Sequence, residues 1–389
     1  MKTLNLLKPI VAASLASLIL VGCSGGSDSS TSKDTDIPSV AYAVEGVIVD
    51  PYIVGAILCE DLNKDGVCNE TEQLSSSSTN SGVFGFENNL TAGSHVIVKT
   101  QGAHEGKTYD LEISGLVGAD GSIDVVSPMT TFETKGLTTI QIAEVLNNAA
   151  SSAGFTGWSI AATDISANPL SSGLMDKKIS ELSDIDLVNI QASLSSYGIL
   201  KIMSGSEALS ALNSMELYTS GMNGELHEIS KAMIQGINST LNTTTLTLIK
   251  EGIDQGKNVM VGNGVPHGTI NTGLPEPTAN LIIKVAVSII DRLAEIGYET
   301  CNSSGGDVTA ALNEVARNEV DITAKSISLG TQLYAFTYHD AMKNSFSGAY
   351  SAVLDGMFAM ESNLKIGYEA KENGYSTIRF DSSNNLIIQ

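Results

Sequence analysis

A short acidic segment, C-E-D-L-N-K-D-G-V-C-N-E-T-E, constrains the fold of this chain more than any other feature. From Cys59 to Glu72 it carries five carboxylates, two asparagines, one glycine and two cysteines. The preceding residues, Gly55 to Leu58, have the pattern of a β-strand, and the following ones, Gln73 to Ser78, have that of a solvated connector. We therefore expect the segment to be a loop between two strands, without flanking helices.

The spacing within this loop is D-x-N-x-D-G-x5-E, which is typical of an EF-hand-type calcium loop. Calcium takes six to eight oxygen ligands at roughly 2.3 to 2.6 Å, and the glycine permits the sharp turn that brings them together. The predicted ligands are Asp61, Asn63, Asp65, the main-chain carbonyl of Val67, Asn69 directly or through water, and both oxygens of Glu72. The alternative is an acidic surface turn without metal, because Asp, Asn and Gly also dominate ordinary turns.

The residues around the loop, from 41 to 127, alternate in short apolar runs that glycine, asparagine, aspartate and serine separate. This pattern predicts strands and favours an all-β sandwich. The expected strands are Val44–Val49, Ile53–Leu58, Val83–Phe86 and His95–Lys99.

The N-terminus has the composition of a secretory signal peptide. Lys2 and Lys8 precede a mostly apolar run that ends at Leu20 and is too short for a comfortable membrane span. Leu20-Val21-Gly22-Cys23 then resembles the lipobox of bacterial lipoproteins. The resemblance implies that the Cys23 thiol carries diacylglycerol, with acyl chains such as palmitate, and that Ser24 directs the protein to the outer membrane. The alternative is an ordinary signal peptide with a chance cysteine.

Two of the remaining cysteines, Cys59 and Cys68, bracket the first half of the acidic loop. Disulfides persist in exported proteins, so we expect these two to pair and to pre-shape the cation site. Cys301 is then left without a partner.

The run from Gly55 to Val98 also resembles the B-type β-sandwich domains of bacterial surface adhesins and the carboxypeptidase-regulatory-like modules. The motifs that carry this resemblance are the D-x-N-x-D-G loop, a T-x-x-G-x-F-x-F strand at Thr79–Phe86 and an A-G-x-Y-x-V strand. The last motif fits less well, because His95 replaces the aromatic residue and Ile97 the valine. The resemblance covers residues 41 to 127 and implies a calcium-stabilised structural module.

Helical periodicity begins after Ser127-Pro128-Met129-Thr130-Thr131, which resembles the junction that follows such modules in surface proteins. Three apolar stripes predict buried helix faces: Leu187, Ile190, Leu194 and Tyr197; Leu226, Ile229, Met233 and Ile237; and Ile282, Val285, Ile289, Leu293 and Ile296. Near the C-terminus, Asn373-Gly374 separates Leu364–Glu369 from Tyr375–Phe380 and predicts a β-hairpin, to which Leu386–Ile388 adds a third strand.

The expected fold class is α+β and multidomain. Its parts are a lipoprotein signal peptide at 1–22, a flexible tether at 23–40, a β-sandwich with the calcium loop at 41–127, a mainly α-helical domain at 128–362 and a C-terminal β-hairpin at 363–389.

Charge and motifs exclude several functions. The net charge is −22, with 43 acidic and 21 basic side chains, which disfavours nucleic acid as a partner. No nucleotide-binding loop and no hydrolase or zinc motif occurs, and the glycine-rich stretch Gly262–Gly268 has the wrong spacing for phosphate binding. We assign no catalytic residue from the sequence.

These features together lead us to expect an outer-membrane lipoprotein, on the periplasmic or the cell-surface face. Its β module would be stabilised by calcium, and its helical domain would bind an envelope protein or an extracellular ligand. Two alternatives are an exported hydrolase-type enzyme with a site in the helical domain, and an accessory subunit of an outer-membrane complex.

Overall fold

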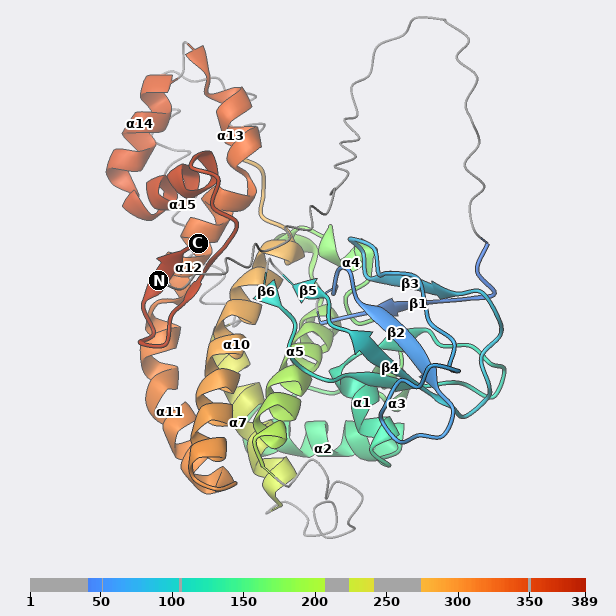
Figure 1. Cartoon of the computed structure of the whole chain (residues 1–389). Coiled ribbons are helices and arrows are strands. Elements are labelled where there is room, and N and C mark those ends of the chain that lie inside the picture. The colour runs from blue at the N-terminus through green and yellow to red at the C-terminus, as the bar shows by residue number, and fades with distance from the viewer. Residues whose placement is uncertain (1–40, 51, 105–106, 207–223, 241–273, 349–350) are drawn as a thin grey trace, which may run out of the picture. The chain divides into compact units, whose positions relative to one another are not determined.

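The computed structural model of the chain shows a mixed α/β protein with small sheets, in which about half of the described residues are helical (Figure 1). It describes residues 41–50, 52–104, 107–206, 224–240, 274–348 and 351–389. The predicted signal peptide, the lipobox cysteine Cys23, the tether and the glycine-rich stretch at 262–268 lie outside these residues.

The first predicted strands are found in two three-stranded sheets. In one, β1 (Val44–Ile48) pairs with β3 (Val83–Phe86) in antiparallel and with β8 (Val125–Val126) in parallel orientation. In the other, β4 (His95–Thr100) lies between β2 (Ile57–Asp61) and β7 (Ser114–Leu116) in antiparallel orientation. A short hairpin of β5 (Ala103–His104) and β6 (Lys107–Thr108) follows β4. Apolar side chains of these strands, such as Ile48, Leu58 and Phe84, are buried in the core.

The serine-rich segment after the acidic loop is not the solvated connector that its composition predicts. It runs along β2, where Leu74 bridges Cys59. The buried Ser75 and Ser78 accept hydrogen bonds from the main-chain N–H groups of Leu58 and Ala56, each at 2.9 Å. These hydroxyls satisfy main-chain donors that an edge strand would leave unpaired.

A capping box joins the sheets to the first helix, α1 (Pro128–Thr134). The Ser127 hydroxyl accepts from the N–H of Thr130, the Thr130 hydroxyl accepts from the N–H of Ser127, and Pro128 occupies the first turn. Thr130 also donates to the carbonyl of Ser114 in β7 at 2.8 Å. The predicted junction at Ser127–Thr131 therefore attaches helix α1 to strand β7 through hydrogen bonds.

The remaining helices pack around a long central one, α10 (Ala279–Ser303), which contacts α5, α7, α11 and α12. The elements before α10 are α2 (Thr139–Ser152), α3 (Ala162–Ile165), α4 (Ser172–Met175), the short η1 (Ile179–Glu181), α5 (Asp184–Ser204) and α7 (Glu225–Thr240). Those after it are α11 (Val308–Ala324), α12 (Ser326–Thr337), α13 (His339–Ser345), α14 (Ser351–Met360) and α15 (Ser362–Glu372).

The three apolar stripes are core faces of these helices, as predicted. All members of the stripes in α7 and α10 are buried, and in α5 only Leu187 is partly exposed. Within the described residues no helix combines the length and the apolar character that a membrane crossing needs.

The predicted C-terminal hairpin is wrong in its strands. Leu364–Glu369 belongs to helix α15, and Asn373-Gly374 ends that helix, with Gly374 at φ +79°. The strand prediction for Leu364–Glu369 was wrong because Leu364 and Tyr368, four residues apart, are both buried on one helix face. The hairpin in the structure pairs β9 (Ile378–Phe380) with β10 (Leu386–Ile388).

Residues 41 to 389 form one compact unit, and the predicted boundaries at 127/128 and 362/363 lie within it. A single cluster of buried apolar residues runs from Val44 to Phe380. Polar contacts also cross the first boundary: Tyr52 donates to the carbonyl of Leu170, and Lys201 pairs with Asp110 at 2.8 Å.

Candidate metal centre

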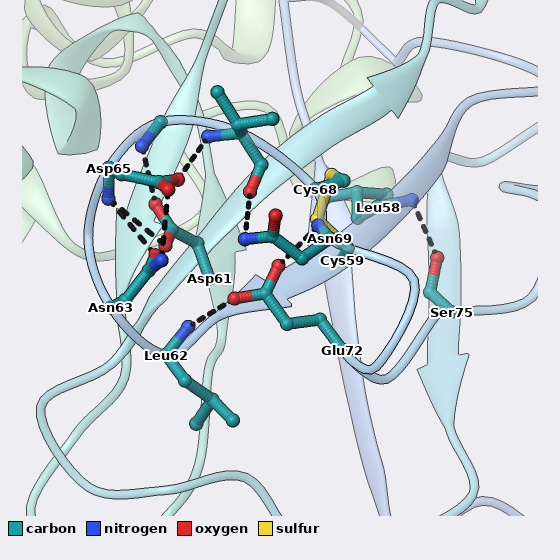
Figure 2. The surroundings of a disulfide bond; sticks show 12 residues. Leu58, Cys59, Asp61, Leu62, Asn63, Asp65, Cys68, Asn69, Glu72 and Ser75 are labelled. Carbon is teal, nitrogen blue, oxygen red and sulfur yellow. Dashed lines mark hydrogen bonds between the residues drawn. A yellow bond between two sulfur atoms is a disulfide. The ribbon is translucent and has the colours of Figure 1, made fainter.

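The acidic loop leaves the end of β2 at Asp61 and returns along the same strand after Glu72. A disulfide between Cys59 and Cys68 closes it, which confirms the predicted pairing, and the two Cα atoms lie 6.1 Å apart. Figure 2 shows Asp61, Asn63 and Asp65 gathered at one end of the loop and Asn69 and Glu72 nearer the disulfide. The disulfide thus holds both halves of the loop against β2.

Asp61 organises the first half of the loop. Its side chain is fully buried, with 0% exposed. One carboxylate oxygen accepts from the N–H of Gly66 at 2.9 Å, and the other accepts from the N–H of Asp65 at 3.3 Å. Gly66 has φ +78°, a backbone conformation that favours glycine, and so permits the turn that aims these N–H groups at the carboxylate.

Glu72 closes the second half in a similar way. Its side chain is 9% exposed. One oxygen accepts from the N–H of Leu62 at 3.0 Å, and the other accepts from the N–H of Asn69 at 2.8 Å. The carboxylate therefore spans the loop from its beginning to its end.

The remaining residues of the loop complete a continuous network. The Asn63 amide donates to one oxygen of Asp65 at 2.9 Å, and the N–H of Val67 donates to the other at 2.8 Å. The Asn69 amide donates to the carbonyl of Val67 at 3.3 Å. All six predicted calcium ligands are thus linked within one loop.

The charges of this loop fit a cation. Among the described residues, neither lysine nor arginine forms an ion pair with Asp61, Asp65 or Glu72. A buried carboxylate needs compensation, and main-chain dipoles supply only partial charge. Each carboxylate oxygen has two lone pairs, so an accepted hydrogen bond leaves room for a metal. Hard oxygen ligands of this kind are those that calcium prefers.

The described part of the chain contains no cluster of three or more His, Cys, Asp or Glu side chains arranged to hold a metal ion. The predicted set includes three such side chains, Asp61, Asp65 and Glu72, and the structure does not bring them together into a metal-holding cluster. In the structure the inner carboxylates bind main-chain N–H groups. Calcium binding here therefore stays a prediction.

Sequence reasoning missed His95, which the register of β2 and β4 places directly opposite Asp61. Burial, reinforced by the positive charges of Lys64 and Lys135, lowers the pKa of His95, although Asp61 opposes this effect. The imidazole is therefore neutral near pH 7 and adds no positive charge beside the loop. Only strand pairing brings His95 to this position.

Sequence reasoning also missed Glu60, a buried carboxylate next to Asp61. One of its oxygens accepts from the N–H of Thr91 at 2.5 Å and from the Ser94 hydroxyl at 3.1 Å. Glu60 thus ties the turn before β4 to β2, and neither of these partners is among the six predicted ligands.

Two residues outside the loop carry chemistry that the proposed metal site does not use. Cys301 is a free cysteine in α10, and burial raises the pKa of its thiol. His339 is buried at the start of α13, with Nδ1 2.9 Å from the exposed Asp340. Of this pair, Asp340 is exposed on the helix surface and His339 is not.

Comparison of the chain with protein-family models, with curated proteins and with solved structures gave no match.

Proposed function

We propose that this chain is a lipid-anchored protein of the bacterial outer membrane. In this proposal residues 41–127 act as a β-sandwich module that calcium stabilises, and the helices that follow bind a partner in the envelope or an extracellular ligand. The lipobox-like sequence that ends at Cys23 supports the anchor. The anchor would hold the protein to either face of the membrane, and three acyl chains bind far more firmly than one.

One observation carries the calcium part of the proposal. The carboxylates of Asp61 and Glu72 are buried, accept hydrogen bonds from the main chain, and have no basic partner among the described residues. A divalent cation would neutralise them and would join the two ends of the loop. Because the disulfide already restricts the loop, little further conformational entropy would be lost on binding.

The role that follows is structural. A ligand that binds only the folded state stabilises it by about 2.7 kcal/mol at a hundredfold excess over its Kd. The loop lies against β2, which pairs with β4 in the second sheet, so the added stability would act on the whole sheet. Calcium would thereby keep the module rigid outside the cytoplasm.

The calcium proposal can be tested by thermal unfolding of the full-length protein with calcium and with a chelator. The variant Asp61→Ala with Glu72→Ala should lose the calcium-dependent rise in Tm. Asp120→Ala is a matched control, because Asp120 is an exposed aspartate in a turn of the same module that binds Ser122. An equal Tm with calcium and with chelator in the wild type would refute the metal site.

The anchor is tested separately. Cys23→Ala should move the protein from the membrane fraction to the soluble fraction, and metabolic labelling with palmitate should disappear. Continued membrane association of the variant would refute lipid anchoring and would leave the calcium result unaffected.

A further inference from the structure

The central helix α10 carries one polar stripe that its packing does not explain. Between Ala279 and Gly297 the positions that are only partly buried are Asn280, Lys284, Ser288, Asp291 and Glu295. They recur every three or four residues, so they lie on one face of a helix whose other faces are core. This face forms the floor of a groove.

Two distant segments form the walls of the groove. These segments are His104 of β5, and Thr377 together with strand β9. Three adjoining hollows share His104 and Val287, and the hollow beside Tyr52 and Lys284 has a volume of about 250 Å³. Figure 1 shows β5 and β6 beside α10 and α5. The groove therefore combines the β module, the central helix and the C-terminal hairpin.

The lining of the hollow between His104 and β9 carries more basic than acidic side chains, whereas the chain as a whole is acidic. Its lining contains three basic side chains, Lys284, Arg292 and Arg379, and two acidic ones, Asp291 and Glu295. Acidic residues outnumber basic ones in the whole chain, 43 to 21. A local excess of positive charge on such a protein favours an anionic ligand.

The two arginines are fixed in place mainly by neutral groups. Arg292 is 6% exposed and donates to the Asn384 amide oxygen at 2.8 Å and to the Ser382 carbonyl at 2.6 Å. It also forms an ion pair with Glu295 at 3.1 Å. Arg379 donates twice to the amide oxygen of Gln389, at 3.0 and 2.6 Å. Arg379 is thus held in position by a neutral group, which leaves its charge for a ligand, whereas Arg292 shares its charge with Glu295.

His104 supplies an independent sign of a ligand. Its side chain lines the groove, and its Nε2 is buried without a hydrogen-bond partner in the described part of the chain. A buried polar atom without a partner costs about 1 to 3 kcal/mol, so such atoms are rare in folded proteins. A bound molecule in the groove would satisfy it.

We infer that this groove binds a small organic carboxylate. The carboxylate occupies the hollow beside Arg292 and Arg379, His104 Nε2 forms a hydrogen bond with the ligand, and the rest of the molecule extends toward Tyr52 and Asn280. A doubly charged phosphate fits less well, because Asp291 and Glu295 line the same hollow and repel the second charge. The inference does not depend on calcium or on the lipid anchor.

Calorimetric titration of the full-length protein with acetate, lactate and succinate tests the inference, with lactamide as the neutral counterpart of lactate and with inorganic phosphate. We expect at least one carboxylate to bind and lactamide to fail. Absence of binding by all three carboxylates at millimolar concentration would overturn the inference. Phosphate binding more tightly than any of them would also overturn it, because the site would then be a general anion site.

Variants locate the site. Arg379→Gln should weaken carboxylate binding by about tenfold. Arg317→Gln is the matched control, since Arg317 is exposed on α11 and pairs with Glu314 at 2.6 Å, away from the groove lining. Equal weakening in both variants would show a general charge effect and would contradict the assignment.

His104→Leu separates binding from folding. It removes the unsatisfied Nε2 and keeps a similar volume, so the free variant should unfold at the wild-type Tm or above it. Carboxylate binding should nevertheless weaken. An unchanged affinity would place the ligand elsewhere and would overturn the role of His104.

Discussion

The acidic loop and the groove along α10 both hold buried charges, but by opposite means. In the loop, the carboxylates of Asp61 and Glu72 bind main-chain N–H groups no more than ten residues away. In the groove, Arg292 binds Asn384 and Ser382, which lie about ninety residues along the chain. The loop is therefore a local structure that its own residues specify, whereas the groove exists only when distant segments have packed together.

The same difference between local and distant contacts appears at two glycines, one in the loop and one in a helix contact outside the groove. Gly66 serves the loop by its backbone conformation alone, since a Cβ there would meet nothing within 4 Å. Gly367 in α15 serves by its lack of volume, because a Cβ there would lie 2.0 Å from the carbonyl oxygen of Gln332 in α12. A turn motif in the sequence predicts the backbone conformation that Gly66 provides. The lack of space for a side chain at Gly367 depends on the neighbouring helix.

The largest effect should follow a change at this helix contact. Gly367→Ala should destabilise the protein by about 3 kcal/mol, because α15 must move away from α12. Gly356→Ala in α14 is the control, since its Cβ would meet nothing within 4 Å, and it should stabilise by about 0.5 to 1 kcal/mol. Urea unfolding measures both. A stable Gly367→Ala variant would show that the distant packing tolerates change and would weaken the contrast with the loop.

A slightly smaller effect should follow removal of the disulfide. Cys59→Ala with Cys68→Ala should lower the free energy of unfolding by about 2.5 to 3 kcal/mol, because the unfolded chain gains the freedom that the closed loop denies it. A reducing agent should lower wild-type stability in urea unfolding to that of the variant and leave the variant unchanged. If the variant matched the oxidised wild type, main-chain hydrogen bonds alone would hold the loop.

The last prediction concerns the buried carboxyl group of Asp50, which lines one of the hollows of the groove. Tyr109 donates to Asp50 at 2.6 Å, and both side chains are buried. Burial raises the pKa of Asp50 well above its ordinary value, against the effect of this hydrogen bond, and the nearby Asp291 adds to the rise. The folded state therefore keeps a proton that the unfolded state releases, so the contribution of Asp50 to stability falls as pH rises from about 4 toward the folded pKa.

Asp50→Asn should remove this loss of stability with rising pH, because the amide accepts the same hydrogen bond and does not titrate. The stability of the variant relative to wild type should rise with pH by up to about 1.4 kcal/mol per pH unit within that window. Urea unfolding from pH 4.5 to 8 measures the difference. Parallel pH profiles for the two proteins would contradict a protonated Asp50.

Sequence reasoning succeeded where the signal was local. The apolar stripes of the helices and the Cys59–Cys68 disulfide follow from residues that lie close together in the chain. It failed where one local pattern fits two structures. Asn373-Gly374 suits a hairpin turn and also a helix end, and only the packing of Tyr368 and Gly367 against neighbouring elements selects the helix.

By itself the sequence determined the acidic loop, its disulfide and the apolar faces of the helices, because these depend on residues close together in the chain. The tertiary structure alone decided that residues 41 to 389 pack as one unit, that His95 faces Asp61 and that His104, Arg292 and Arg379 meet at one groove. The physical reason is that strand register and helix packing join residues far apart in sequence. No spacing rule records which of those residues become neighbours.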